Sequence, residues 1–154
     1  MATIKEKPID SRQIQKCLYR TFGKHIIFLN AFVFSMWYES DFAYFTKAGY
    51  GYEVEIKRSY QDFKADFTKG NKHTDMQGGK GKQNYFSFCF ADKALSDQCL
   101  KEIPEKYGVY YVGNFFIECI RPPQKLHTNR MDWKDIVVRL SSSYKTKIHR
   151  VLFD

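Results

Sequence analysis

The chain has few cysteines, and their spacing excludes the common uses of this residue. Cys occurs 4 times among 154 residues, with no C-x-x-C pair and no matching set of histidines, so a zinc site is not expected. Cys89 stands in an apolar run and is predicted to be a buried thiol. Free cysteines without a secretory leader indicate a reducing cytoplasm as the location.

Long apolar runs are also missing. The longest apolar stretch, residues 26–38, is interrupted by Asn30 and Ser35 and is too short to cross a bilayer. We therefore expect no membrane among the partners, and we predict a buried strand in this stretch.

Acidic residues are outnumbered by basic ones. The chain has 17 Asp and Glu against 25 Lys and Arg, which gives a net charge of +8 and a pI near 9.3. A polyanionic partner such as nucleic acid fits this balance, although many basic proteins bind none. The aromatic content of 18% excludes a disordered chain, and the length suits one domain with a sizeable core.

Residues 41–57 predict a hairpin with charged residues at its open end. Two strand-like runs flank a loop predicted over residues 48–50, in which Gly49 can take a left-handed conformation. Strand side chains alternate between the two faces of a sheet, so a register of the wrong parity would mix charged with apolar residues.

In the preferred register Phe42 faces Ile56 and Asp41 faces Lys57. Glu55 shares the face of Lys57, because the two are separated by one residue. The pattern therefore gathers two carboxylates and one lysine on the same side of the hairpin.

Two carboxylates close together repel each other, and a single lysine offsets this only in part. A divalent cation removes the conflict, and oxygen ligands suit Mg²⁺ or Mn²⁺. Such an ion can hold a phosphate oxygen and lower the pKa of a bound water, which a lysine can orient. The pattern indicates metal-dependent hydrolysis of a phosphodiester, and the alternative is a solvent-facing hairpin edge with charged strand ends.

The surrounding segment resembles a known family. The stretch ESDFAYFTKAGYGYEVEIKRSYQDFKADFTKGNKH is similar to the core of the PD-(D/E)XK nuclease superfamily, the restriction-endonuclease-like proteins. Small phage and bacterial members and the MmcB-like DNA-repair endonucleases are the most similar. The shared features, in order, are an acid (Asp41), a hairpin, an E-x-K triplet (residues 55–57), a serine (Ser59) and a D-F-x-x-D-F helix (residues 62–67). The similarity is close over residues 39–73 and looser to about residue 130, and Ser40 replaces the usual proline.

The resemblance implies a catalytic group of three side chains. Asp41 and Glu55 would bind Mg²⁺ or Mn²⁺ with the main-chain carbonyl of Ile56, and Lys57 would serve the nucleophilic water. The N-terminal helix offers no clear glutamate as a further ligand. Glu39, two residues before Asp41 and so on the same strand face, could supply it.

The resemblance also implies the fold and the function. We expect a single α/β domain with a mixed sheet of about four to six strands flanked by helices. The expected activity is that of a Mg²⁺-dependent deoxyribonuclease in DNA repair, recombination or phage DNA processing. The alternatives are a catalytically inactive nuclease-like module that holds DNA or a protein, and a structural interaction protein. The oligomeric state is open, and cleavage of both DNA strands would favour a homodimer.

Basic residues after the E-x-K triplet are candidate DNA contacts. Lys64, Lys69, Lys72 and His73 could contact phosphates near the metal, or each could be a solvated surface charge. Lys72 and His73 gain weight because a K-H pair commonly follows this helix in the family. Asp66 could meet a basic neighbour, but we expect it to face solvent.

The remaining segments complete the predicted organisation. Residues 70–84 are rich in glycine and lysine and predict a mobile basic loop that could close over DNA. No nucleotide cofactor is expected, because the hydroxyl residue of a phosphate loop is absent.

The other expected elements are a polar tail (1–8), helices at about 11–22, 59–69, 92–101 and from 132 onward, and strands at about 25–37, 84–90, 107–112 and 115–120. In the last helix, Trp133, Ile136, Val137, Leu140 and Tyr144 form the apolar face.

Overall fold

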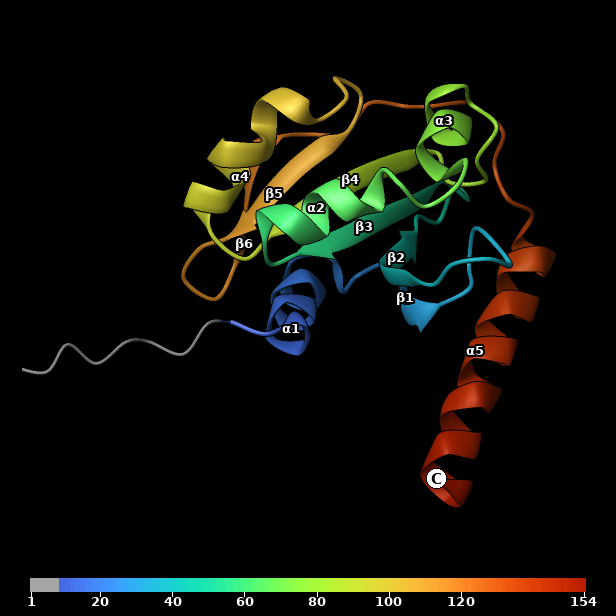
Figure 1. The fold of residues 1–154 in the computed structure, drawn as a ribbon. Coiled ribbons are helices and arrows are strands. Elements are labelled where there is room, and N and C mark those ends of the chain that lie inside the picture. Colours follow the sequence, from blue (N-terminus) through green and yellow to red (C-terminus); the bar gives the residue numbers. More distant parts are fainter. Residues whose placement is uncertain (1–8) are drawn as a thin grey trace, which may run out of the picture.

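The computed structural model describes residues 9–154, and the polar tail predicted for residues 1–8 lies outside them. Six strands form one mixed sheet in the order β1-β2-β3-β4-β5-β6 (Figure 1). The strands are β1 (Ile26–Ala31), β2 (Ser40–Phe45), β3 (Gly51–Lys57), β4 (Tyr85–Phe90), β5 (Gly108–Val112) and β6 (Ile117–Arg121). β3, β4 and β5 are parallel, and the other neighbours are antiparallel. The predicted α/β domain with a mixed sheet is confirmed.

Helices cover both faces of this sheet (Figure 1). They are α1 (Ser11–Phe22), α2 (Tyr60–Asp66), α3 (Lys72–Gln77), α4 (Lys93–Cys99) and α5 (Trp133–Phe153), with a 3-10 turn at Leu100–Glu102. α1 packs on one face, where Ile14 and Leu18 join Phe42 and Val54 in the core. α2, α3 and α4 lie on the opposite face, whereas α5 extends away from the sheet.

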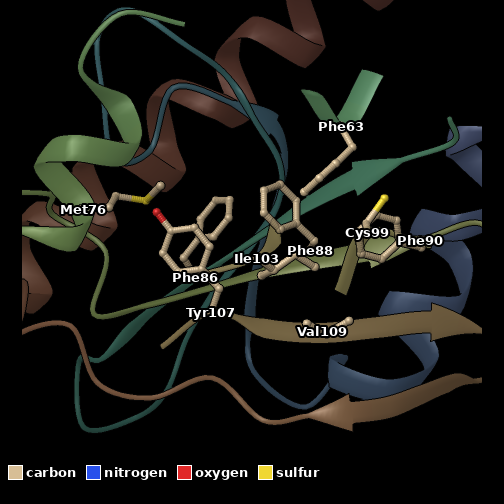
Figure 2. Packing of buried hydrophobic residues seen from close by; sticks show 9 residues of the cluster. All are labelled: Phe63, Met76, Phe86, Phe88, Phe90, Cys99, Ile103, Tyr107 and Val109. Carbon is tan, nitrogen blue, oxygen red and sulfur yellow. The ribbon is translucent and has the colours of Figure 1, made fainter. Parts of the chain in front are cut away.

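The core between the sheet and helices α2 to α4 is built from phenylalanines of one strand. Alternation along β4 puts Phe86, Phe88 and Phe90 on the same face, and all three are fully buried. They pack with Phe63 of α2 and with Tyr107, which precedes β5 (Figure 2). Each such side chain contributes about 1.5–3 kcal/mol on burial. This aromatic layer fixes α2 and α3 over the sheet.

In the β2–β3 hairpin each side chain lies on the predicted face of the sheet, but the strand pairing is shifted by two residues. Phe42 pairs with Val54, two residues from its predicted partner Ile56. The loop covers residues 47–49, because the Thr46 N–H donates to Tyr50 O at 3.1 Å, and Gly49 has a φ of 90°. A three-residue loop needs its left-handed residue in the last position, and the glycine takes that position here. The same register, extended by one step, brings Asp41 opposite Glu55 instead of Lys57.

The predicted strand at about 25–37 is too long. β1 ends at Ala31, after Asn30 takes a positive φ of 47°. Val33 and Phe34 beyond it are still buried, but Trp37 is 93% exposed. The sequence does not reveal where the strand ends, because a buried irregular segment has the same apolar composition as a buried strand.

The interpretation of residues 70–84 as a loop is wrong in part. Residues 72–77 form α3, which buries Lys72, His73 and Met76. Asn84 is also anchored, since its side chain accepts a hydrogen bond from Gly51 N–H at 2.9 Å. The helix has only six residues and is flanked by glycines, so the sequence contains too few turns to show a helical repeat of apolar residues. The preceding helix α2 is correspondingly shorter than expected and ends at Asp66.

Other predictions are confirmed. Ser59 caps α2 by accepting a hydrogen bond from Asp62 N–H at 3.1 Å, and β5 pairs with β6 as a hairpin. Cys89 is fully buried. The last helix begins after Asp132 as expected, but of its predicted apolar face only Ile136 is buried.

Candidate active site

β3 places three charged side chains on a buried face of the sheet. Glu53, Glu55 and Lys57 are 1%, 5% and 1% exposed. Their parallel neighbours in β4 are the three core phenylalanines, so these charges lie beneath α2 and α3. Charges in such a position are costly unless they are paired or hold a metal, and their partners therefore define the site.

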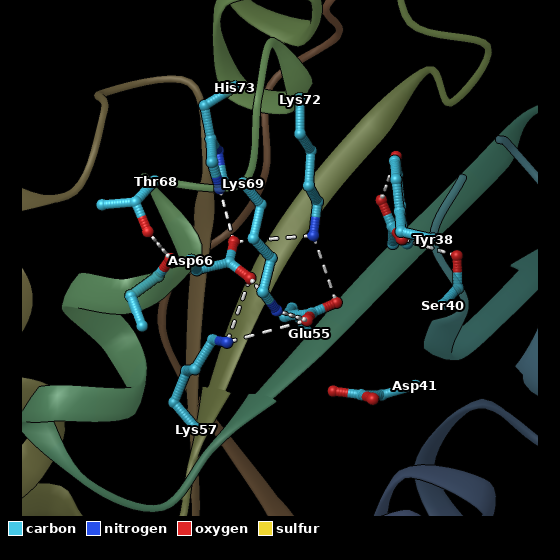
Figure 3. A network of polar contacts seen from close by, with 12 residues as sticks. Tyr38, Ser40, Asp41, Glu55, Lys57, Asp66, Thr68, Lys69, Lys72 and His73 are labelled. Atoms are coloured by element: carbon cyan, nitrogen blue, oxygen red, sulfur yellow. Dashed lines mark hydrogen bonds and ion pairs between the residues drawn. The ribbon is translucent and has the colours of Figure 1, made fainter.

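Asp41 reaches the same place from the start of β2. Its Oδ2 accepts a hydrogen bond from the Ile56 N–H at 2.8 Å, which ties the carboxylate to β3. Within residues 9–154, its other oxygen has no hydrogen bond. Burial raises the pKa of Asp41, while the Ile56 N–H, Lys57 and Lys72 act in the opposite direction. Figure 3 shows Asp41 beside Glu55, in agreement with the register of the hairpin.

Glu55 is the central carboxylate of the site. Its Oε1 lies 3.6 Å from Lys57 Nζ, and its Oε2 lies 3.4 Å from Lys72 Nζ. Oε2 is buried and lacks a hydrogen-bond donor among the described residues. Burial raises the pKa of Glu55 to about 8, although the charge of Lys72 opposes this and that of Asp41 adds to it.

Asp66 was expected to face solvent, and this is wrong, because the residue is fully buried. It accepts hydrogen bonds from Lys57 Nζ and Lys69 Nζ, both at 3.1 Å, and it also pairs with His73 Nε2 (Figure 3). Lys72 Nζ is 3.5 Å away. Burial alone would raise the pKa of Asp66, but the hydrogen bond from His73 and the charges of Lys72 and Lys57 lower it strongly.

His73 is a structural partner of Asp66 within a buried chain of polar groups. Its Nδ1 lies 2.8 Å from the Tyr107 hydroxyl, and its ring stacks on Phe67 with centroids 4.3 Å apart. A tautomer in which the Tyr107 hydroxyl donates to Nδ1, and Nε2–H donates to Asp66, satisfies all three groups. Both ring nitrogens are therefore engaged inside the protein.

Glu53 is a buried carboxylate beside the candidate site that the sequence analysis did not single out. Its carboxylate accepts hydrogen bonds from Ser40 Oγ at 2.5 Å and from Gln83 Nε2 at 2.8 Å, with the Tyr38 hydroxyl at 3.4 Å. Glu53 is thus satisfied by neutral donors, unlike Glu55. Ser40 supplies one of these donors and so has a structural role here. The one available signal was that Glu53 shares its strand face with the E-x-K triplet.

The predicted DNA-contacting residues fall in different places. Lys69 is part of the cluster and 51% exposed at its side chain, with Nζ 3.9 Å from Glu55 Oε1. Lys72 is buried, and its ammonium lies 4.5 Å from the ring centroid of Tyr38. Lys64 instead pairs with Glu102 at 2.8 Å on the surface. Of the four predicted contacts, Lys69 alone combines exposure with a place in the cluster.

Glu39 lies apart from the cluster. It is exposed, precedes β2 and lines a groove beneath α5 together with Arg139. No hydrogen bond or ion pair between described residues joins it to Asp41, Glu55 or Lys57. The local chain irregularity before β2 removes the strand alternation on which its predicted role depended.

The donor atoms of the site fit a hard divalent cation. Asp41 and Glu55 each have a carboxylate oxygen without a hydrogen-bond donor, and the Ile56 carbonyl is the third candidate ligand. Within residues 9–154 no group of three or more His, Cys, Asp or Glu side chains is suited to hold a metal. The candidate set has two such side chains and one main-chain oxygen.

Comparisons with known proteins inform the fold alone. No protein-family model matches the chain, and no curated protein does. A solved structure is similar: the SPO1766 protein of unknown function from Silicibacter pomeroyi, at 14% identity and a TM-score of 0.64. The match covers 96% of this chain and 91% of that one.

No helix in residues 9–154 combines the length and the apolar composition needed to cross a membrane.

Proposed function

We propose that the chain is a metal-dependent deoxyribonuclease that hydrolyses phosphodiester bonds with an activated water. The observation that carries this proposal is the meeting of Asp41, Glu55 and Lys57 on one face of the β2–β3 hairpin (Figure 3). The resemblance of residues 39–73 to the PD-(D/E)XK nucleases supports it. The proposal includes DNA as the partner, a cytoplasmic location, and a role in repair, recombination or phage DNA processing.

Asp41 and Glu55 would hold Mg²⁺ or Mn²⁺ together with the Ile56 carbonyl. When bound, the ion supplies positive charge at the phosphate and lowers the pKa of a water. Lys57 can orient that water and offset charge that develops on the phosphate. Asp66 positions Lys57, because its Oδ1 holds the ammonium at 3.1 Å within the buried cluster.

Lys69 is the candidate contact to the DNA backbone. Its ammonium lies at the exposed side of the cluster, 3.1 Å from Asp66 Oδ1. A phosphate that approaches the site would meet this charge first. The net charge of +8 adds a longer-range attraction for DNA.

A specific observation favours a second function, a nuclease-like module that binds DNA or a protein without cutting. Lys72 Nζ lies between Glu55 and Asp66, at 3.4 Å and 3.5 Å. This buried ammonium compensates Glu55 without any metal ion. The two functions differ in whether a cation or Lys72 balances Glu55 when DNA is bound.

Cleavage assays on supercoiled, linear and single-stranded DNA distinguish the two functions. We expect products with Mg²⁺ or Mn²⁺ and none in EDTA. Glu55→Gln and Lys57→Ala are expected to lower the rate at least about 100-fold, because each removes a group of the reacting centre. Lys64→Ala, which alters the surface pair with Glu102, is the control and should cleave as the wild type. DNA binding that is equal with Mg²⁺ and with EDTA, without any product, would assign the second function.

A further inference from the structure

α5 presents its apolar stripe to solvent instead of to the sheet. Six residues, all between 38% and 84% exposed, make up this stripe: Trp133, Val137, Leu140, Tyr144, Ile148 and Val151. At about 100° per residue they fall within about 80° of the helix surface. A narrow, continuous apolar stripe of this kind is typical of a helix that packs along another helix.

The side of α5 that faces the body of the protein is mainly polar. Ile136 anchors the first turn in the core, and Arg139 Nη1 donates to Val33 O at 2.7 Å. Farther along, Ser142, Thr146 and Arg150 line the groove beneath the helix. Isolated helices are marginal in water, and most helices in proteins are stabilised by packing an apolar face. The stripe therefore lacks a partner within residues 9–154.

The charge pattern of α5 favours one arrangement of two copies. In residues 132–142 two acidic and two basic side chains balance, whereas residues 143–154 carry the basic Lys145, Lys147 and Arg150 against one acidic residue, Asp154. A parallel pair would place both basic halves side by side. An antiparallel pair places each basic half beside a balanced half that contains Asp132 and Asp135, and it also opposes the helix dipoles.

The stripe is self-complementary in the antiparallel arrangement. With Leu140 opposite Tyr144 of the second copy, Trp133 comes opposite Val151 at each end. The same residues serve both copies, as a two-fold contact requires.

We propose that α5 is a dimerisation helix that packs against α5 of a second copy of this chain, antiparallel about a two-fold axis. In Figure 1 the helix extends away from the sheet, and all six residues of the stripe are exposed. The dimer is independent of nuclease activity. A dimer without cleavage would contradict only the proposed function, and a monomeric nuclease would contradict only the dimer.

Sedimentation velocity tests the dimer from about 1 µM to about 500 µM protein. The wild type is expected to dimerise, and Tyr144→Asp and Leu140→Asp are expected to raise the dissociation constant at least about tenfold. Both side chains are exposed, so the body should keep its thermal unfolding transition. Ser142→Asp, on the opposite side of the helix, is the control and should dimerise as the wild type. A wild type that stays monomeric, or a dimer that Tyr144→Asp leaves intact, would overturn the proposal.

Cross-linking tests the orientation in a Cys119→Ser background, which removes the exposed native thiol. Chains carrying Trp133→Cys are mixed with chains carrying Val151→Cys and oxidised. The antiparallel pair predicts disulfides between the two kinds of chain, whereas like-with-like disulfides would overturn this arrangement. Flotation of monomeric protein with vesicles of about 30% phosphatidylglycerol, lost in Tyr144→Asp, would instead assign the stripe to an anionic membrane surface.

Discussion

Asp66 shows how one buried residue can organise several charged ones. Its carboxylate contacts Lys57, Lys69, Lys72 and His73, which come from β3, the segment after α2, and α3. Removing the anion leaves buried cations without their partner, which typically costs about 3–5 kcal/mol. The site therefore depends on a residue that would not contact the substrate.

Asp66→Asn is expected to lower the free energy of unfolding by about 3–5 kcal/mol at neutral pH. Because the folded-state pKa of Asp66 is lowered, its contribution is present above the unfolded value near 3.8 and is lost as the pH falls through the folded value. Urea unfolding at neutral and acidic pH measures both effects. Asp97→Asn, which alters a surface pair with Lys93, is the control. Equal stability of Asp66→Asn and the wild type would refute the organising role.

Glu55 predicts a pH dependence of metal binding. Burial and the charge of Asp41 raise its pKa to about 8, so near neutral pH this carboxyl binds a proton more readily than an ordinary glutamate does. Mn²⁺ must displace that proton, so its affinity should rise with pH toward about 8 and binding should release a proton. Calorimetry in buffers of different ionisation enthalpy measures the release. Affinity that does not change with pH would contradict the assignment of Glu55 as a ligand.

Glu55 also affects how the stability of the protein depends on pH. The folded-state pKa of Glu55 is raised from 4.5 to about 8, so the folded protein binds the proton more tightly than the unfolded chain. The contribution of Glu55 to stability is therefore greatest below 4.5 and declines as the pH rises toward about 8. This trend is opposite to that of Asp66.

At the scale of elements, α3 is the segment that completes the site. Its Met76 is 1% exposed and packs into the aromatic core, while Lys72 and His73 on the same helix reach the acidic cluster. With only six residues, α3 has little helical stability of its own. The packing of Met76 therefore holds the two cationic side chains in place.

Met76→Ala is expected to cost about 2–5 kcal/mol in unfolding free energy, because it leaves a cavity in the core. Hydrogen exchange should accelerate most in α3. Thr74→Ala, on the exposed side of the same helix, should change the stability by no more than about 0.5 kcal/mol. Uniform exchange in α3 of both variants would show that Met76 does not anchor the helix.

Elements with local signals could be predicted from the sequence. Alternation identified β3 and its polar face, and Ser59 correctly marked the start of α2. The hairpin register was two residues off, because pattern alone fixes the parity of a register while the turn fixes its value. α3 was missed, because its helical identity depends on contacts of Met76 with distant strands.

The three central residues of the candidate site could be predicted from the sequence, but their partners could not. Asp41, Glu55 and Lys57 share a face as the pattern indicated. The partners of these residues were not predictable, because Asp66, Glu53 and Lys72 meet them through tertiary packing. Asp66 was expected to face solvent, because a sequence gives no direct view of which charged residues of a helix the tertiary fold buries.

At the scale of the whole molecule, the net charge of +8 predicts how the proposed DNA binding responds to salt. Each phosphate contact releases counterions, so affinity should fall at least about tenfold between about 50 mM and about 200 mM salt. Fluorescence anisotropy with a labelled duplex measures this slope. Lys69→Ala should reduce the slope by about one contact, whereas Lys64→Ala should not. Salt-independent binding would exclude the phosphate backbone as the principal contact.

Calorimetric titration of Mn²⁺ into the pure protein tests the central claim most directly. We predict that the wild type binds the ion, that Lys64→Ala binds it equally well, and that Glu55→Gln and Asp41→Asn each lose at least about tenfold in affinity. All four proteins should be folded, as their unfolding transitions will show. No binding by the folded wild type, or equal binding by Glu55→Gln, would contradict the claim that these two carboxylates hold a catalytic cation.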